Sequence, residues 1–140
     1  IETLNSNLQG KRSPIKSALL DQRVVSGLGN IYVSEILFRC KISPIKTAAE
    51  ITGKSKRVGV KVQRIFENTN QVIAEAIMVG GSTISDFRGV SGDSDLGYFA
   101  QQFRVFNREG EECITESCKG IILRIVQSGR STFYCPKCQK

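Results

Sequence analysis

Four cysteines near the C-terminal end constrain this chain more than any other feature of its sequence. They form two close pairs, Cys113 with Cys118 and Cys135 with Cys138, and sixteen residues separate the pairs. Two thiolate pairs at such spacing are typical of a structural zinc site with four sulfur ligands. So short a segment buries too little apolar surface to fold by itself, so metal–thiolate bonds would supply much of its folding free energy. The sequence therefore predicts one structural Zn²⁺ in a small module.

The residues between the two cysteine pairs read as a β-hairpin. Two runs rich in β-branched and aromatic residues, 121–127 and 131–134, flank the turn Ser128-Gly129-Arg130. Zinc would therefore hold a β-hairpin whose tip is basic.

The alternative interpretation of these cysteines is a pair of disulfides in a secreted protein. Three features count against it: the cysteine count of five is odd, no apolar stretch resembling a signal peptide opens the chain, and Cys135-Pro136-Lys137-Cys138 suits chelation better than bridging. A reducing, cytoplasmic environment is the expectation. The fifth cysteine, Cys40, lies in an apolar helical pattern, and because the chain has no histidine to act as its base, we interpret it as a buried hydrophobic residue.

Charge is distributed unevenly along the 140 residues. Lys and Arg outnumber Asp and Glu by twelve to four in residues 1–66 and by five to one in residues 113–140, whereas acids lead by eight to three in residues 67–112. Two basic regions around an acidic middle, with a net charge of +7, favour a polyanion such as DNA as the partner. No stretch is long and apolar enough to cross a membrane, so we expect no membrane partner, and we expect a monomer.

The first 80 residues carry helical patterns, so we expect a mainly α chain with a small β zinc module. Ser13-Pro14 is typical of a helix start, and apolar periodicity continues to Leu20. Later patterns predict helices over about 31–40, capped by Asn30, and about 55–78. The first of these places Val33, Ile36, Leu37 and Cys40 on one face, and the second presents Val58, Val62, Ile65, Phe66, Thr69, Val72, Ile73, Ala76 and Ile77. We interpret Asp21, Glu35 and Glu50 as solvated helix positions.

The sequence after the predicted long helix differs from it in composition and periodicity. Residues 82–97 hold three glycines and three aspartates with little periodicity, which predicts a long loop. A strand-like run, Phe103-Arg104-Val105-Phe106, then leads into the zinc module.

Gly27-Leu28-Gly29-Asn30, at the start of a helix, is the second informative motif. Glycines let the backbone approach a ligand closely, and a helix N-terminus offers free N–H groups to an anion. A DNA phosphate would fit there, and Lys16 and Arg130 gain interest if they converge with the motif.

Two stretches carry a resemblance to a known family. Residues 21–35, DQRVVSGLGNIYVSE, and 127–139, QSGRSTFYCPKCQ, resemble the C-terminal half of formamidopyrimidine-DNA glycosylases, in the family's order. The resemblance implies a helix–two-turn–helix DNA-binding domain over 1–100 and a zinc finger over 101–140, both binding damaged double-stranded DNA. It implies phosphate-binding roles for Lys16 and Asn30, beside Gly29, and a catalytic role for Arg130 as proton donor in δ-elimination. The resemblance also implies that residues 82–97 form a lid over the extruded base and that Ser82, Ser85 and Asp86 contact this base.

Two features depart from the family pattern. Four residues, where the family usually has two, separate Cys113 from Cys118. The family's nucleophile, an N-terminal proline followed by glutamate, is absent from these residues, which begin with Ile1 and Glu2.

We therefore interpret the chain as the DNA-binding C-terminal part of a bifunctional base-excision-repair glycosylase and abasic-site lyase for oxidised purines such as 8-oxoguanine and formamidopyrimidines. We expect the chain alone to bind DNA without cutting it, because nothing in the sequence indicates a lysine with a depressed pKa. The alternatives are an endonuclease VIII-type glycosylase for oxidised pyrimidines and a non-catalytic zinc-dependent DNA-binding protein.

Overall fold

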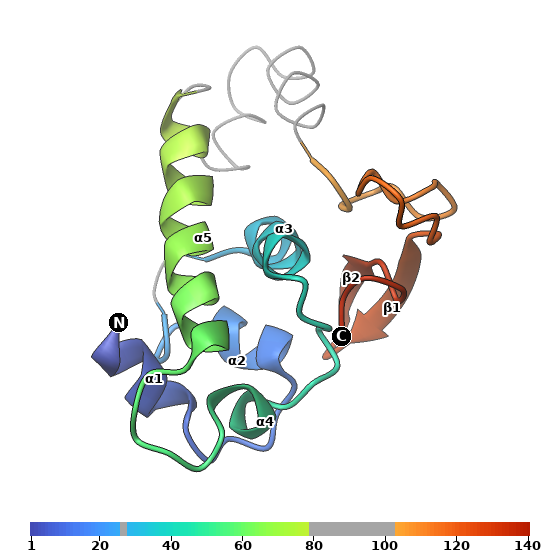
Figure 1. The fold of residues 1–140 in the computed structure, drawn as a ribbon. Helices are drawn as coiled ribbons and strands as arrows, with labels where there is room; N and C mark the ends of the chain where they lie inside the picture. Colours follow the sequence, from blue (N-terminus) through green and yellow to red (C-terminus); the bar gives the residue numbers. More distant parts are fainter. Residues whose placement is uncertain (26–27, 79–102) are drawn as a thin grey trace.

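The computed structural model describes residues 1–25, 28–78 and 103–140 of the chain. Within these residues the architecture is mainly helical, with one two-stranded antiparallel sheet (Figure 1), which confirms the predicted fold class. The elements are α1 (Glu2–Leu8), α2 (Ile15–Leu20), α3 (Asn30–Cys40), α4 (Ala48–Thr52), α5 (Val60–Met78), β1 (Leu123–Gln127) and β2 (Arg130–Tyr134).

Helix α3 lies at the centre, between α5, α2 and the hairpin strand β2 (Figure 1). Its predicted apolar face, from Val33 to Cys40, is buried in the core, as expected. The N-cap residue is Gly29, whose backbone is extended, so the predicted Asn30 cap is wrong by one position. The helix ends at Cys40, and its C-cap residue, Lys41, adopts the left-handed conformation with φ 59°.

Helix α5 begins later than predicted, at Val60 rather than near residue 55. The preceding loop is held by amide side chains of the N-terminal segment: Asn5 Nδ2 donates to the carbonyl of Lys56 at 3.2 Å, and Gln9 Nε2 donates to the carbonyl of Ser55 at 2.5 Å. A carbonyl engaged by a distant side chain favours the loop over another helical turn.

The apolar stripe of α5 is narrower than its periodicity predicted. Val62, Ile65 and Val72 are buried, whereas 42% of Ile73 is exposed. The helix packs one face against α3 and the N-terminal helices, so an apolar residue at the stripe's margin stays in solvent. The side chains of Ala76 and Ile77 lie outside the described residues.

Helix α2 starts one residue later than Ser13-Pro14 predicted, with Pro14 as its N-cap and no capping side chain. The carbonyl of Lys46 instead accepts a hydrogen bond from Ile15 N–H, at 2.6 Å. The short helix α4, which we did not predict, has Thr47 as its N-cap, and the Thr47 hydroxyl accepts a hydrogen bond from Glu50 N–H at 3.1 Å. A Thr-x-x-Glu spacing was the signal available for it.

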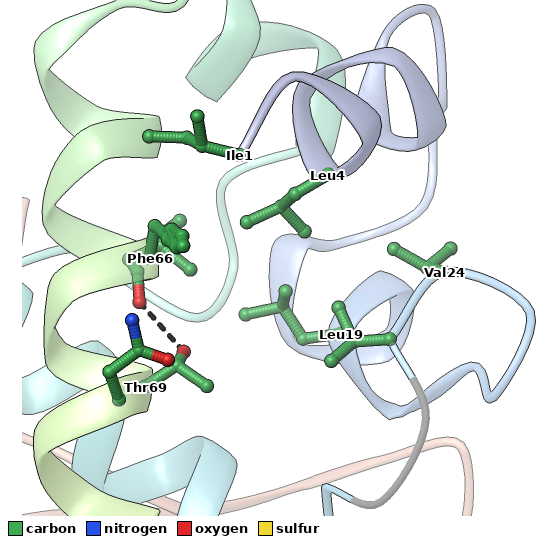
Figure 2. Close-up of a pocket in the computed structure, with 9 residues that line it drawn as sticks. Ile1, Leu4, Leu19, Val24, Phe66 and Thr69 are labelled. Carbon is green, nitrogen blue, oxygen red and sulfur yellow. Dashed lines mark hydrogen bonds between the residues drawn. The ribbon is translucent and has the colours of Figure 1, made fainter.

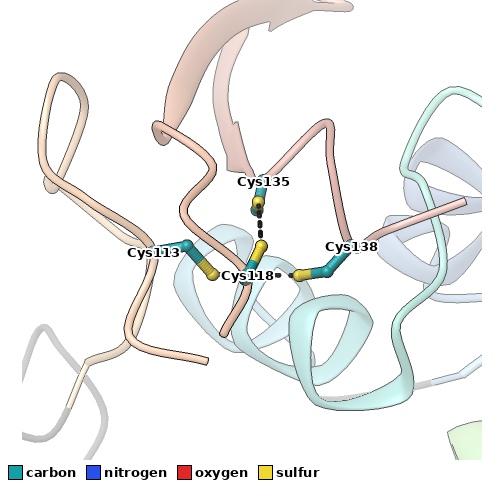
Figure 3. Close-up of side chains that lie close together, drawn as sticks. All are labelled: Cys113, Cys118, Cys135 and Cys138. Carbon is teal, nitrogen blue, oxygen red and sulfur yellow. Dashed lines mark hydrogen bonds between the residues drawn. The ribbon is translucent and has the colours of Figure 1, made fainter. Parts of the chain in front are cut away.

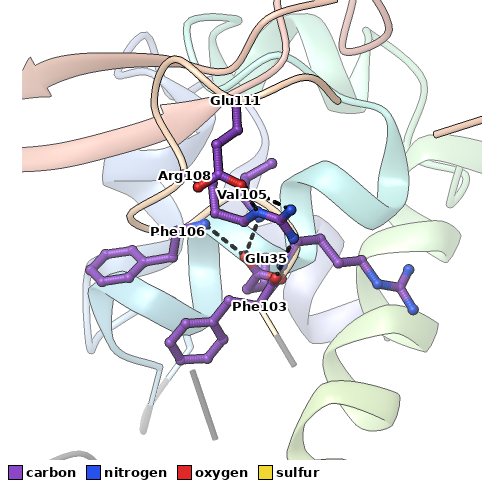
Figure 4. A network of polar contacts seen from close by, with 7 residues as sticks. Glu35, Phe103, Val105, Phe106, Arg108 and Glu111 are labelled. Atoms are coloured by element: carbon purple, nitrogen blue, oxygen red, sulfur yellow. Dashed lines mark hydrogen bonds and ion pairs between the residues drawn. The ribbon is translucent and has the colours of Figure 1, made fainter. Parts of the chain in front are cut away.

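The environment of Glu35 contradicts two predictions, namely that this residue is solvated and that residues 103–106 form a strand. Glu35 is 3% exposed rather than solvated, and its carboxylate accepts the backbone N–H groups of Arg104, Val105 and Phe106 at 2.7, 2.9 and 3.0 Å (Figure 4). Residues 103–106 are therefore an irregular turn and not the predicted strand, because their donors go to a side chain instead of a neighbouring strand. This contact ties α3 to the segment that enters the zinc module.

An apolar pocket of about 210 Å³ lies between α1, the end of α2 and α5 (Figure 2). Leu4, Leu19, Val24 and Phe66 point into it, with Thr69 at its polar side. In the described ranges, no helix has the length and apolar character needed to span a bilayer.

Candidate zinc centre and nucleic-acid interface

The four predicted zinc ligands converge in space (Figure 3). Their sulfur atoms all lie within 4.8 Å of one another. Cys113 Sγ is 3.8 Å from Cys138 Sγ, and Cys118 Sγ is 3.6 Å from Cys135 Sγ. Tetrahedral zinc with sulfur bonds of about 2.3 Å requires sulfur–sulfur separations of about 3.8 Å, whereas a disulfide requires roughly 2 Å. The cluster therefore fits one structural zinc ion and not two disulfides.

The first cysteine pair reaches the second pair despite its four intervening residues. Ser117 and Lys119 both adopt positive φ, at 68° and 58°, which folds the backbone tightly around Cys118. Gly120 has no room for a side chain, since an added Cβ would lie 2.6 Å from Cys135 Sγ. The longer spacing is thus absorbed in a turn that requires glycine at position 120.

A small apolar cluster joins the zinc module to α3. Phe38, from α3, is buried together with Val105, Ile122, Phe133 and three of the cysteines. The side chain of Gln139 adds a polar link: its Oε1 accepts from Cys135 N–H at 2.8 Å, and its Nε2 donates to the carbonyl of Ile42 at 2.9 Å. Helix α3 therefore contributes a side chain to the core of the zinc module.

The pKa values of the clustered thiols shift in both directions. Burial acts to raise the pKa of Cys113, but hydrogen bonds with Thr115 and the neighbouring sulfurs outweigh it and lower that pKa to about 7. Burial, with the neighbouring sulfurs of Cys135 and Cys113, raises the pKa of Cys138 to about 12. Zinc coordinates thiolates, so binding would displace protons and its affinity would fall as pH decreases. Cys40 lies outside the cluster, and burial raises its pKa to about 12, which fits a buried hydrophobic residue better than a nucleophile.

The second predicted site also assembles, around the ammonium group of Lys16. Lys16 Nζ donates to Asn30 Oδ1 at 2.5 Å, to Thr132 Oγ1 at 2.6 Å and to the carbonyl of Ser131 at 3.1 Å. Asn30 Nδ2 donates to the same carbonyl at 3.0 Å. The N-terminal ends of α2 and α3 are thus joined to strand β2 of the hairpin.

Lys16 corrects the expectation that no lysine has a depressed pKa. Its side chain is fully buried, and this burial, followed by the charge of nearby Arg130, lowers its pKa to about 8. The group remains largely protonated at pH 7, because that pKa still lies above neutrality. An ammonium has three N–H donors, and all three are engaged.

Arg130 and Gly29 are the exposed parts of this site. Arg130 opens β2 directly after the turn residues Ser128 and Gly129, which have φ of 51° and 77°, as a two-residue type I′ hairpin turn requires. Gly29 has open space where a side chain would project, and its helix carries no side-chain cap hydrogen bond. Ser82, Ser85 and Asp86 lie outside the described residues.

Comparison with known proteins agrees with this geometry. Residues 1–88 match the formamidopyrimidine-DNA glycosylase H2TH domain family. The chain belongs to this family. Residues 110–140 match a second family, described as a zinc finger found in FPG and IleRS.

Curated relatives in the formamidopyrimidine-DNA glycosylase family match nearly the whole chain. The formamidopyrimidine-DNA glycosylase of Cereibacter sphaeroides is 47% identical and that of Roseobacter denitrificans is 52% identical, over 98% and 94% of this chain. These alignments cover 46% and 44% of the two relatives. The chain therefore spans less than half the length of the curated relatives it matches.

Solved structures of formamidopyrimidine-DNA glycosylases share the fold. A Lactococcus lactis FPG mutant in complex with a Fapy-dG containing DNA superimposes with a TM-score of 0.78 at 31% identity, covering 98% of this chain and 46% of that one. The MutM (FPG) protein from Thermus thermophilus gives 0.76 at 34% identity, covering 98% and 48%. The resemblance and the fold class predicted from sequence are confirmed.

Proposed function

We propose that this chain is the DNA-binding C-terminal part of a base-excision-repair glycosylase and abasic-site lyase that removes oxidised purines. One observation carries the proposal: the contacts of Lys16 and Asn30 with β2 bring the basic hairpin tip beside the uncapped N-terminus of α3. The relatives named formamidopyrimidine-DNA glycosylase support it, as does the solved Lactococcus lactis protein with a Fapy-dG containing DNA.

The electrostatics of the cluster favour an anion as ligand. Lys16 and Arg130 are close enough for the arginine to lower the pKa of the lysine. Among the residues that the structure describes, no carboxylate forms an ion pair with either cation. A phosphate beside Gly29 would relieve the repulsion between the cations and accept hydrogen bonds from backbone N–H groups at the α3 N-terminus.

The residues of the site have two roles: some contact DNA, and one holds the hairpin in position. In our proposal, Arg130 and the α3 N-terminus at Gly29 and Asn30 contact the DNA backbone, while Lys16 adds charge and holds the hairpin in place. In a complete enzyme, Arg130 would place its donors against a leaving phosphate during δ-elimination, because an arginine stays protonated.

The other parts of the proposal rest on the resemblance. We propose residues 1–100 and 101–140 as the two domains and residues 82–97, with Ser82, Ser85 and Asp86, as the loop over the extruded base. We also propose an intracellular monomer.

Duplex-DNA binding tests the interface. For Arg130→Gln we expect roughly tenfold weaker binding to a duplex with a stable abasic-site analogue, and a log–log salt slope reduced by about 0.9, because one phosphate contact is lost. Gly29→Ala should weaken binding but lower thermal stability no more than Gly59→Ala, because both glycines directly precede a helix and the added methyl group meets no protein atom at either position. Fluorescence anisotropy across a salt series measures both quantities.

Two positions outside the site provide matched controls. Lys61→Gln removes a cation from the start of α5, and Gly59→Ala adds a methyl group in open space. Equal losses in the controls and in the site variants would refute a localised interface.

Strand cleavage by the 140-residue chain is a separate prediction. We expect no covalent capture by borohydride on abasic-site DNA, because the lysine whose pKa is lowered to about 8 is fully enclosed by Asn30, Ser131 and Thr132. A sugar carbon has no access to that nitrogen, and Schiff-base formation needs an accessible unprotonated amine. Efficient capture at one residue, located by mass spectrometry, would show that these residues carry their own nucleophile.

A further inference from the structure

Lys41, at the end of α3, is held in an unfavourable backbone conformation. Its φ of 59° places it in the left-handed region, where helix ends usually carry glycine because a side chain is costly there. A residue keeps such a conformation when its surroundings enforce it, so the contacts of its side chain are informative.

Both side-chain hydrogen bonds of Lys41 lead to the zinc module. Lys41 Nζ donates to Thr115 Oγ1 at 2.6 Å and to Cys138 Sγ at 3.7 Å. It also lies 4.1 Å from the centre of the Phe38 ring. The backbone carbonyl of Lys41 accepts from the N–H of Lys140 at 3.1 Å, so main chain and side chain both engage the module.

The two partners of the ammonium are distinctive within the module. Cys138 is the half-buried ligand, whereas the other three cysteines of the cluster are buried. Thr115 lies in the long connection between Cys113 and Cys118, and its hydroxyl is itself 4.0 Å from Cys138 Sγ. Lys41 therefore lies over the ligand that solvent reaches most easily.

The chemistry of a four-thiolate site gives this position a role. Zinc with four thiolates carries a net charge of two minus, and its sulfur atoms are stabilised by nearby cations and N–H donors. We propose that Lys41 is an outer-sphere ligand of the zinc site that neutralises part of its charge through Cys138 and slows zinc loss. Thr115 orients the ammonium group, and the Phe38 ring covers it by a cation–π contact. This role is independent of DNA binding.

Zinc-transfer kinetics on the zinc-loaded chain test the inference. The rate of transfer to excess 4-(2-pyridylazo)resorcinol should rise roughly tenfold in Lys41→Met, since loss of an outer-shell partner typically weakens metal binding by that factor or more. Lys41→Arg keeps the cation and should stay closer to the unaltered chain. In the Co²⁺-substituted protein, Lys41→Met should shift the thiolate-to-cobalt charge-transfer bands to lower energy, because a sulfur that loses an N–H donor becomes a better electron donor.

Two further variants separate the metal effect from folding. Lys41→Gly removes the side chain but relieves the backbone strain, so zinc should leave faster although thermal stability does not fall. Lys119→Met is the matched control, because Lys119 also has positive φ, at 58°, and is an exposed lysine next to a zinc ligand. Unchanged transfer rates and cobalt bands in Lys41→Met, or equal changes in Lys119→Met, would overturn the proposal and leave Lys41 as a helix terminator only.

Discussion

Removal of zinc is expected to unfold residues 113–140 while α1 to α5 stay folded. The apolar cluster of the module is small, and three of its seven buried members are zinc ligands. Structural zinc sites with cysteine ligands contribute apparent binding free energies of about 10–16 kcal/mol, which is folding free energy for such a module. The helical core is a separate buried cluster that contains none of the four ligands.

Nuclear magnetic resonance measures this directly. After chelation, amide resonances of residues 113–140 should collapse to unfolded positions, most helical resonances should persist, and added zinc should restore the spectrum. Cys135→Ser should reproduce the chelated spectrum, whereas Cys40→Ser, a loss of a buried thiol outside the cluster, should not. A folded hairpin in the chelated protein would contradict a zinc-dependent module.

Glu35→Ala is expected to lower the free energy of unfolding by about 3–5 kcal/mol, a large part of a typical total of about 5–15 kcal/mol. The substitution leaves three backbone N–H groups without an acceptor, and one of them, on Val105, is fully buried. Each such group costs about 1–3 kcal/mol. Urea denaturation measures the total, and hydrogen exchange at Arg104, Val105 and Phe106 measures where the protection is lost.

Two substitutions check the assignment. Glu35→Gln keeps one acceptor oxygen but turns an NH₂ group toward the same amides, so we expect an intermediate loss of about 1–3 kcal/mol. Glu111→Ala removes a half-exposed carboxylate that pairs with Arg108 at 3.0 Å, and surface pairs of this kind contribute about 0–1 kcal/mol. Equal losses for Glu35→Ala and Glu111→Ala would show that the buried acceptor is unimportant.

The sequence by itself determined the features that depend on local spacing. Paired cysteines predicted the zinc ligands, apolar periodicity predicted α3 to within one residue, and the turn Ser128-Gly129 predicted the hairpin. Each of these signals lies within one short stretch of chain, where periodicity and turn chemistry act directly. The same reasoning misjudged the start of α5, because a loop held by Asn5 and Gln9 depends on partners about 50 residues away.

Only the tertiary structure decided which polar side chains are buried and what they contact. Glu35 lies in an ordinary helical pattern, and its carboxylate oxygens accept from amides about 70 residues away. Lys16 contacts a hairpin more than 110 residues away, and Lys41 contacts Cys138 across 97 residues. Such positions look like solvated charges in a sequence, because a buried charge is stabilised by partners that only folding brings near. Lys16 lies on α2, Glu35 lies on α3 and Lys41 is the C-cap residue of α3. The central helix α3 therefore connects the zinc module to the rest of the fold.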